Sequence, residues 1–350
     1  MTKREKIISF SALALLAAAA VALFIILLTR DAKPVTKSKT FYGYFGTADT
    51  CTLICYSDDS DEIFEKRCKE VENLVVRYHK LSDIYHEYKD INNLKTLNDS
   101  AGGDAVAIDP ELFDMLEYAK KMYYLTNGDV NIAMGAVLSI WHEYRNGGFG
   151  TELPPMDALT AAAEHCDIES LVLDRENMTA RLTDPEASVD VGAIAKGYAT
   201  ERAAELLESM GADGYALSFS GNIRTVGEYP DGGLWDIKIR NPLHGANGYA
   251  TELKLEECAV VTSGGYENFY EVDGVRYHHI INKDTLMPAN FFASVSVIHD
   301  DSGFADCMST ALFNMSYEDG LALIKRAADE GYGELTVIWI TLDGEIIKSS

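Results

Sequence analysis

The feature that most constrains the fold is a succession of short β-forming runs in the second half of the chain, from about residue 168 onward. Most of these runs are separated only by gaps of turn length. Antiparallel neighbours can be joined by such a turn, whereas a parallel pair needs a crossover of about a dozen residues or more. The pattern therefore predicts an α+β body with a largely antiparallel sheet core and packed helices, and it argues against a doubly wound parallel fold.

Hydrophobic periodicity and turn residues predict the bounds of the individual strands and helices. Strands are predicted over 170–174, 179–183, 187–191, 214–219, 223–227, 235–240, 249–255, 258–262, 267–272, 276–281, 294–299, 335–340 and 344–348, with two more in 41–57 on either side of a turn near Gly46. Helices are predicted over 61–80, from Asp109 and Pro110, from 157, over 193–210, and near 304–315 and 318–328. The apolar stripe expected on the first helix is Ile63, Val71, Leu74, Val75 and Tyr78.

The N-terminal segment predicts a membrane anchor. Ile7 to Leu28 is a run of 22 residues without a charge, preceded by three basic residues within the first six positions. At about 1.5 Å rise per residue, a helix of this length spans a hydrocarbon core of roughly 30 Å. The alternatives are cleavage after the stretch Ala17–Ala20, as in an export signal, and a buried core helix.

We expect residues 1–30 to form an uncleaved signal anchor, residues 31–40 a short tether and residues 41–350 one catalytic body. Pro34 and several Lys, Thr and Ser residues characterise the tether. This organisation predicts attachment to the cell membrane by one N-terminal transmembrane helix, with the catalytic body outside the cytoplasm.

Charge and cysteine usage exclude other classes of protein. The 55 acidic against 30 basic residues give a formal net charge of -25. Nucleic acids and anionic lipid surfaces both require a positive face, so neither is expected as the main partner. The 6 cysteines are scattered without a CxxC pair. They therefore predict neither a disulfide framework nor a zinc site.

The segment Ser188–Ala199 places a glycine turn between a β-run and a helix, with Lys196 in the first helical turn. Backbone N–H groups at a helix start, the positive end of the helix dipole and a lysine together suit a pyrophosphate. An ordinary strand-to-helix turn with a solvated lysine is the alternative.

Asp306 and Thr310 lie four residues apart in a predicted helix and therefore on one face. A carboxylate with a hydroxyl provides hard oxygen ligands suited to Mg²⁺, which also recruits substrate phosphates. The alternative is an acid near a helix start with an inward threonine bonded to its own backbone.

Two histidines and an asparagine complete the candidate chemistry. His278 and His279 are adjacent in a predicted strand, so they should point to opposite faces, and one of them could accept a proton near neutral pH. One surface and one structural histidine is the alternative. Asn131 leads into an apolar helix and could present its amide to the edge of a ring.

In their order, these segments resemble the FAD:protein FMN transferases of the ApbE family over roughly residues 41–345. The matching segments are YFGT (44–47), NLKTLN (93–98), NGDVNIAMG (127–135), VDVGAIAKGYA (189–199), SGNI (220–223), SGGYENF (263–269), HHIIN (278–282) and ADCMSTAL (305–312). The pair VDVGAIAKGYA and ADxxxTAL, with a His-Ile-Ile run between them, is the specific part of this resemblance.

The resemblance implies a T-fold-like body that cleaves FAD at its pyrophosphate with Mg²⁺. FMN would be joined through its phosphate to a Thr or Ser hydroxyl of an exported acceptor protein, with release of AMP. Asp306, Thr310 and the backbone carbonyl of Ala193 would be the Mg²⁺ ligands. Lys196 would contact FAD, and His279 would be the general base. The residues implied to border the flavin or the adenine are Phe45, Asp129, Val130, Asn131, Ser263 and Ile281.

The chain departs from the family pattern at four positions. Asn131 stands where many relatives carry Asp, Phe45 where many have Met, Asn92 where Ser is usual, and Leu286 where Gly is expected. Two alternatives to transfer follow. One is a Mg²⁺-dependent FAD pyrophosphatase that gives FMN and AMP, and the other is a surface FAD-binding protein without chemistry.

Overall fold

The computed structural model describes residues 36–46, 49–146, 152–243, 248–266 and 268–349. The predicted anchor over residues 1–30 lies outside these ranges. Within them, no helix combines the length and the apolar character needed to cross a membrane. The first strand begins at Lys37, inside the stretch predicted as a tether.

The main sheet has eight strands in the order β1-β2-β6-β7-β10-β13-β14-β15. All of its neighbouring strands pair antiparallel, which confirms the predicted α+β class. The strands are β1 (Lys37–Tyr42), β2 (Thr50–Cys55), β6 (Tyr215–Phe219), β7 (Asn222–Val226), β10 (Ala259–Gly264), β13 (Ser294–His299), β14 (Thr336–Ile340) and β15 (Ile346–Lys348).

Three smaller antiparallel units surround the main sheet. They are β3 (Val106–Ala107) with β5 (Thr179–Leu182) and β4 (Leu171–Asp174), the ribbon β8 (Trp235–Arg240) and β9 (Tyr249–Leu255), and the hairpin β11 (Phe269–Val272) and β12 (Val275–His278). Short 3-10 turns occur at Ile168–Ser170 and Pro230–Gly232.

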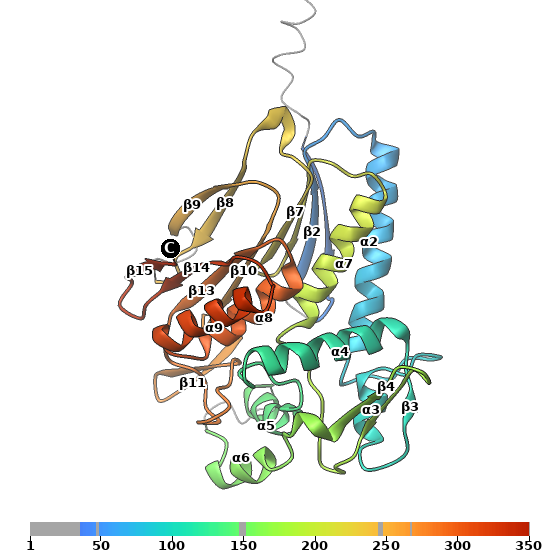
Figure 1. Ribbon diagram of the computed structural model, residues 1–350, viewed down its shortest axis with the longest axis vertical. Helices are drawn as coiled ribbons and strands as arrows, with labels where there is room; N and C mark the ends of the chain where they lie inside the picture. Colours follow the sequence, from blue (N-terminus) through green and yellow to red (C-terminus); the bar gives the residue numbers. More distant parts are fainter. Residues whose placement is uncertain (1–35, 47–48, 147–151, 244–247, 267, 350) are drawn as a thin grey trace, which may run out of the picture.

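Helices α2 (Asp61–Ser82), α7 (Ala195–Ser209), α8 (Ser302–Phe313) and α9 (Tyr317–Asp329) cover one face of the main sheet, and the β8–β9 ribbon packs on the other. The other helices are α3 (Leu94–Asp99), α4 (Pro110–Leu125), α5 (Gly135–Asn146) and α6 (Met156–Ala163). Figure 1 shows α7 beside α2, and α8 lies against β10 and β13. Alternation along β10 turns Ala259 and Val261 toward the helices and Val260 toward the ribbon. Ser263 therefore also faces α8.

Helix α2 illustrates why these residues form these elements. Its N-cap Ser60 accepts a hydrogen bond from the Ile63 N–H, and its buried stripe includes Val71 and Val75. Ile63 was predicted on that stripe, but it is 44% exposed because it lies in the first turn, beyond the edge of the sheet-facing side. Arg67 on the buried side donates to the carbonyl of Gly211 at 2.8 Å, which fixes the end of α7.

One strand prediction was wrong. In residues 187–191, Ala187, Val189 and Val191 are buried, yet the segment joins no sheet and forms only an isolated bridge between Met134 and Ser188. The Asn98 side chain accepts from the Val189 N–H at 2.8 Å and donates to the Val189 carbonyl at 3.0 Å. The Asn98 amide thus pairs with Val189, while the Ser188 carbonyl accepts from the Gly135 N–H at 3.0 Å and the Asp190 N–H donates to the Ile132 carbonyl at 2.8 Å. These bonds fix the segment that precedes α7.

The six cysteines lie mostly in the core. All six are free thiols, and all except the half-buried Cys166 are buried. Cys51 and Cys55 both point to the inner face of β2, on either side of Leu53. They act as small apolar residues of the core.

Candidate active site

The first turns of α7 and α8 pack against each other. The Gly197 N–H in the first turn of α7 donates to Asp306 Oδ2 on α8 at 2.7 Å. A Cβ at position 197 would lie 2.3 Å from the Asp306 Cβ and 2.6 Å from the Ser302 carbonyl oxygen. Only glycine permits this approach. The N–H groups at this helix start were expected to be free for a pyrophosphate, but one of them is used to hold Asp306.

Asp306 is a buried carboxylate whose negative charge is only partly offset by neighbouring groups. Burial raises its pKa, while the Lys196 charge and the Gly197 N–H act in the opposite direction. The Asn222 amide also favours the charged form, although its buried Nδ2 makes no hydrogen bond of ordinary geometry to the described residues. A carboxylate in such surroundings gains stability from a cation, so the donor fits a metal ligand.

Hydroxyl groups lie next to this carboxylate. Ser263 Oγ on β10 lies 2.8 Å from Ser309 Oγ and 3.4 Å from Thr310 Oγ1. Ser309 in turn donates to the Asp306 backbone carbonyl at 3.0 Å. The longer contact of the half-buried Thr310 leaves its hydroxyl oxygen available to a ligand. Asp306, Thr310 and Ser263, predicted from separate motifs, are thus brought together.

Within the described ranges, no group of three or more His, Cys, Asp or Glu residues could hold a metal. The predicted ligand set is consistent with this finding because it contains only one such residue, Asp306. Its other donors are the Thr310 hydroxyl and the Ala193 carbonyl. Ala193 lies in the turn just before Ile194, the N-cap of α7. Oxygen donors of this kind suit Mg²⁺ better than Zn²⁺.

The two histidines have different roles, but they do not share a strand as predicted, because β12 ends at His278. His278 Nε2 lies 2.7 Å from the Ala289 carbonyl, and its Nδ1 accepts from the Ile280 N–H at 3.2 Å. This histidine is structural. His279 Nδ1 is buried without a hydrogen-bond partner among the described residues. Burial first, and then the Lys196 charge, lower the pKa of His279 to about 3, so its ring is neutral at pH 7.

The residues predicted to border the flavin or the adenine each have contacts within the protein. The Phe45 N–H donates to His79 Nδ1 at 3.2 Å, and its ring packs edge-on against Phe219. Val130 and Ile281 are buried side chains of the core. The Val130 N–H donates to Thr126 Oγ1 at 3.1 Å.

Asn131 and Asp129 are engaged within the protein. Asn131 Oδ1 accepts from the Ala133 N–H at 2.8 Å, and its Nδ2 donates to the Cys166 carbonyl at 2.9 Å. The Asn131 amide, which was expected to face the edge of a ligand ring, therefore bonds to backbone groups of the protein and holds a turn. Burial raises the pKa of Asp129 to about 6, and its carboxylate lies 3.6 Å from Lys283 Nζ.

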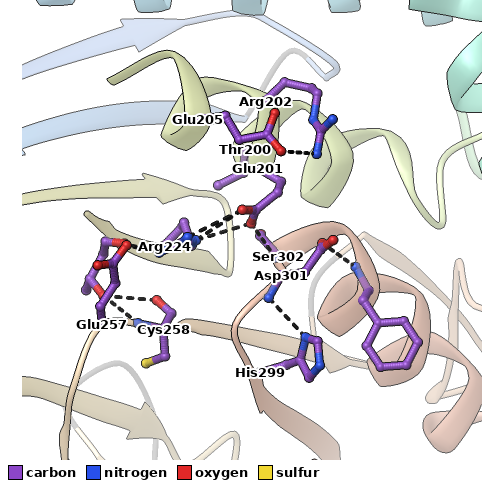
Figure 2. A network of polar contacts seen from close by, with 12 residues as sticks. Thr200, Glu201, Arg202, Glu205, Arg224, Glu257, Cys258, His299, Asp301 and Ser302 are labelled. Carbon is purple, nitrogen blue, oxygen red and sulfur yellow. Dashed lines mark hydrogen bonds and ion pairs between the residues drawn. The ribbon is translucent and has the colours of Figure 1, made fainter. Parts of the chain in front are cut away.

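A buried polar network fixes the position of α8 (Figure 2). Glu201 on α7 pairs with Arg224 on β7 at 3.2 Å, and it accepts from the Ser302 N–H at 2.6 Å. Asp301 caps the same helix through the Phe304 N–H at 2.9 Å. Sequence reasoning missed this network, because its residues come from three separate elements and carry no local motif.

Known proteins resemble this chain in sequence and in overall fold. The model of the ApbE family matches residues 45–332. A protein of Treponema pallidum named FAD:protein FMN transferase is 35% identical over 254 residues, covering 68% of this chain and 69% of that protein. The crystal structure of the ApbE protein of Thermotoga maritima superposes with a TM-score of 0.78 at 24% identity, covering 90% of this chain and 97% of that one. The flavin transferase ApbE of Vibrio cholerae gives a TM-score of 0.72 at 26% identity with the same coverage.

Proposed function

Because this chain belongs to the ApbE family and is an FAD:protein FMN transferase, we propose that it joins the FMN moiety of FAD to a Thr or Ser hydroxyl of an acceptor protein and releases AMP. The single observation that carries this proposal is the contact between Gly197 and Asp306, which brings the starts of two helices together around one carboxylate. In the reaction, the acceptor oxygen bonds to the FMN phosphorus and the bond to the AMP phosphate breaks.

Mg²⁺ would be held by Asp306, Thr310 and the backbone carbonyl of Ala193. The raised pKa of Asp306 supports this assignment, since a bound cation would offset the cost of burying the charged carboxylate. The chemistry that Mg²⁺ supplies in such a site is neutralisation of phosphate charge, as a Lewis acid and template.

Lys196 would bind the diphosphate. It lies close enough to Asp306 and His279 to act on the pKa of both, and its ammonium group makes no ion pair with the residues that the structure describes. A lysine without a carboxylate partner is free to pair with phosphate oxygens. It would stabilise the charge that develops on them as the bond to AMP breaks.

His279 would take the proton of the acceptor hydroxyl. Its ring is neutral at pH 7 and therefore able to accept a proton, although a pKa of about 3 makes it a weak base in the free enzyme. The FAD diphosphate would bring negative charge next to Lys196 and so offset one cause of the low pKa. We expect His279 to become more basic when FAD binds.

We also propose where in the cell this reaction takes place. The uncharged run over residues 7–28, behind three basic residues, supports a single anchor in the cell membrane with the catalytic body outside the cytoplasm. The acceptor would then be an exported protein. The net charge of -25 supports a partner other than nucleic acid.

Incubation of the full chain with FAD and Mg²⁺, with and without an extract of exported proteins, tests the proposed reaction. We expect little AMP from FAD alone, and AMP together with covalently bound flavin once the extract is added. Rapid release of AMP and free FMN without the extract would instead identify a pyrophosphatase. Bound FAD without AMP under every condition would identify a binding protein.

A further inference from the structure

Three hydroxyl groups form a chain between α8 and β10. Ser309 on α8 and Ser263 on β10 are buried, and their Oγ atoms lie 2.8 Å apart. Ser263 Oγ also lies 3.4 Å from Thr310 Oγ1. At the other end of the chain, Ser309 Oγ lies 3.0 Å from the Asp306 backbone carbonyl. The chain therefore runs from one proposed Mg²⁺ ligand, Thr310, to the backbone of another, Asp306.

The direction of every hydrogen bond in this chain follows from its last member, because each hydroxyl has a single proton. A carbonyl oxygen only accepts, so the Ser309 proton points to Asp306. In its contact with Ser263, Ser309 must then accept, and Ser263 donates its one proton there. In the remaining contact Ser263 must accept, so the Thr310 proton points to Ser263. The chain thus leaves one orientation for the Thr310 proton.

This arrangement decides between the two interpretations of Thr310. A threonine inside a helix often donates to the carbonyl four residues earlier. For Thr310 that carbonyl belongs to Asp306, and it accepts from the Ser309 hydroxyl instead. Among the described residues, the Thr310 hydroxyl bonds to Ser263 and not to its own helix backbone. With its proton held toward β10, Thr310 keeps oxygen lone pairs free for a cation.

Packing alone does not require the buried serines. Nearby side chains of α8, including Ala305, Met308 and Leu312, are buried and apolar, and so is Val261 on β10. A hydroxyl in such surroundings must find a hydrogen-bond partner, because an unpaired one costs free energy. Alanine at position 309 would avoid this requirement and would favour the helix. The orientation that the chain gives Thr310 explains the serines better than packing does.

We propose that Ser309, acting through Ser263, is a positioning residue that holds the Thr310 proton away from Mg²⁺ and so turns an oxygen lone pair toward it. This inference rests on the proposed function, because it uses the same Mg²⁺ site at Asp306 and Thr310. Loss of a group that orients a metal ligand typically lowers metal affinity by about 10- to 100-fold.

Calorimetric titration of the purified full chain with Mg²⁺ tests this role. In Ser309→Ala, Ser263 loses its acceptor and turns its proton to Thr310 Oγ1, where it competes with the cation. Mg²⁺ affinity should therefore fall about 10- to 100-fold. When Ser263→Ala is added to Ser309→Ala, the competing proton is gone and most of the affinity should return. A purely structural role of Ser309 would instead give the double variant the larger loss.

Ser296→Ala is the matched control. The buried Ser296 on β13 lies opposite Thr262 of β10, and their hydroxyl oxygens are 2.8 Å apart on the face of the sheet that points away from α8. This variant also removes one buried hydroxyl, but its Mg²⁺ affinity should equal that of the wild type.

Two results would overturn the inference. One is a Mg²⁺ affinity of Ser309→Ala equal to that of the wild type, and the other is a double variant that binds Mg²⁺ no better than Ser309→Ala. The titrations need neither FAD nor an acceptor. A chain that binds Mg²⁺ in the expected order of variants but never transfers FMN would therefore contradict only the proposed function.

Discussion

At the scale of single residues, the proposed chemistry depends on the charge of the Asp306 carboxylate and of the His279 imidazole. Motifs in the sequence were sufficient to name Asp306, Thr310, Lys196 and His279. They could not show that the first turn of α7 donates to Asp306, because that contact joins residues 109 positions apart.

Asp306→Asn should abolish the response to Mg²⁺ without harming the fold. The amide can still accept the Gly197 N–H, and it removes a buried charge whose desolvation raises the pKa of the native carboxyl. We expect the Tm without metal to be equal or higher, no shift in Tm on addition of Mg²⁺, and transfer reduced by more than about 100-fold. A variant that keeps its Mg²⁺-dependent activity would contradict the metal assignment.

His279 should make stability depend on pH in the acidic range. Its folded pKa of about 3 lies below the ordinary value of 6.5, so the unfolded chain binds the proton more readily between these values. Stability from this group is therefore lost as pH falls from about 6.5 toward 3, by up to about 1.4 kcal/mol per pH unit. Urea unfolding at pH 7 and pH 5 should show a smaller loss in His279→Gln than in the wild type. Parallel losses in the two proteins would argue against a buried neutral ring.

At the scale of elements, the site is an arrangement of helix starts on a sheet. The antiparallel strands were predictable because their connections are short. Residues 187–191 were misassigned as a sheet strand because their backbone partners are the Asn98 side chain and the irregular segment before α5, and such partners are not visible locally. Leu286, where the family pattern has Gly, adopts a left-handed φ of 58°. Its carbonyl accepts from Trp141 Nε1 at 3.0 Å, a contact that helps hold this conformation.

Gly197→Ala tests the contact between α7 and α8. The added Cβ would overlap Asp306 and the Ser302 carbonyl, so the helices must separate. We expect the free energy of unfolding to fall by about 1–3 kcal/mol and Mg²⁺ affinity to fall with it. Gly320→Ala in α9 is the matched control, since its new Cβ meets a flexible Leu312 methyl at 3.2 Å and helix propensity improves. Equal stability of the two variants in chemical denaturation would refute the close approach.

Arg224→Met tests the network that holds the start of α8. Removing the guanidinium leaves Glu201 buried without its ion pair, and loss of one partner of a buried pair typically costs about 3–5 kcal/mol. The free energy of unfolding, measured by chemical denaturation, should fall by that amount. Glu257→Gln, at the exposed end of the same network, should cost less than about 1 kcal/mol. A loss in Arg224→Met no larger than in this control would show that the pair does not fix α8.

At the scale of the whole molecule, an acidic protein is expected to bind an anionic dinucleotide. The formal charge of -25 describes the chain as a whole, whereas Lys196 and the start of α7 place positive charge at the proposed site. The antiparallel class was predictable, but the strand order was not. Residues 51–55 pair with residues 215–219, which lie 160 to 168 positions later in the chain, and no local pattern encodes that pairing.

Removal of residues 1–30 tests the proposed anchor. The full chain should sediment with membranes, because the uncharged run would occupy the hydrocarbon core, and the shortened chain should be released in soluble form. Transfer to a soluble acceptor should continue, since the site residues all lie beyond Lys37. Immunodetection in membrane and soluble fractions gives the answer, and equal distribution of both chains would contradict an uncleaved anchor.

Peptide mapping by mass spectrometry tests the central claim most directly. The full chain is expressed together with the exported proteins of its host, and Asp306→Asn is expressed in parallel. We expect FMN joined through its phosphate to a Thr or Ser of another protein in the wild-type culture. This modification should be absent from the Asp306→Asn culture. Exported proteins without covalent flavin in the wild-type culture, or the same modification in both cultures, would contradict it.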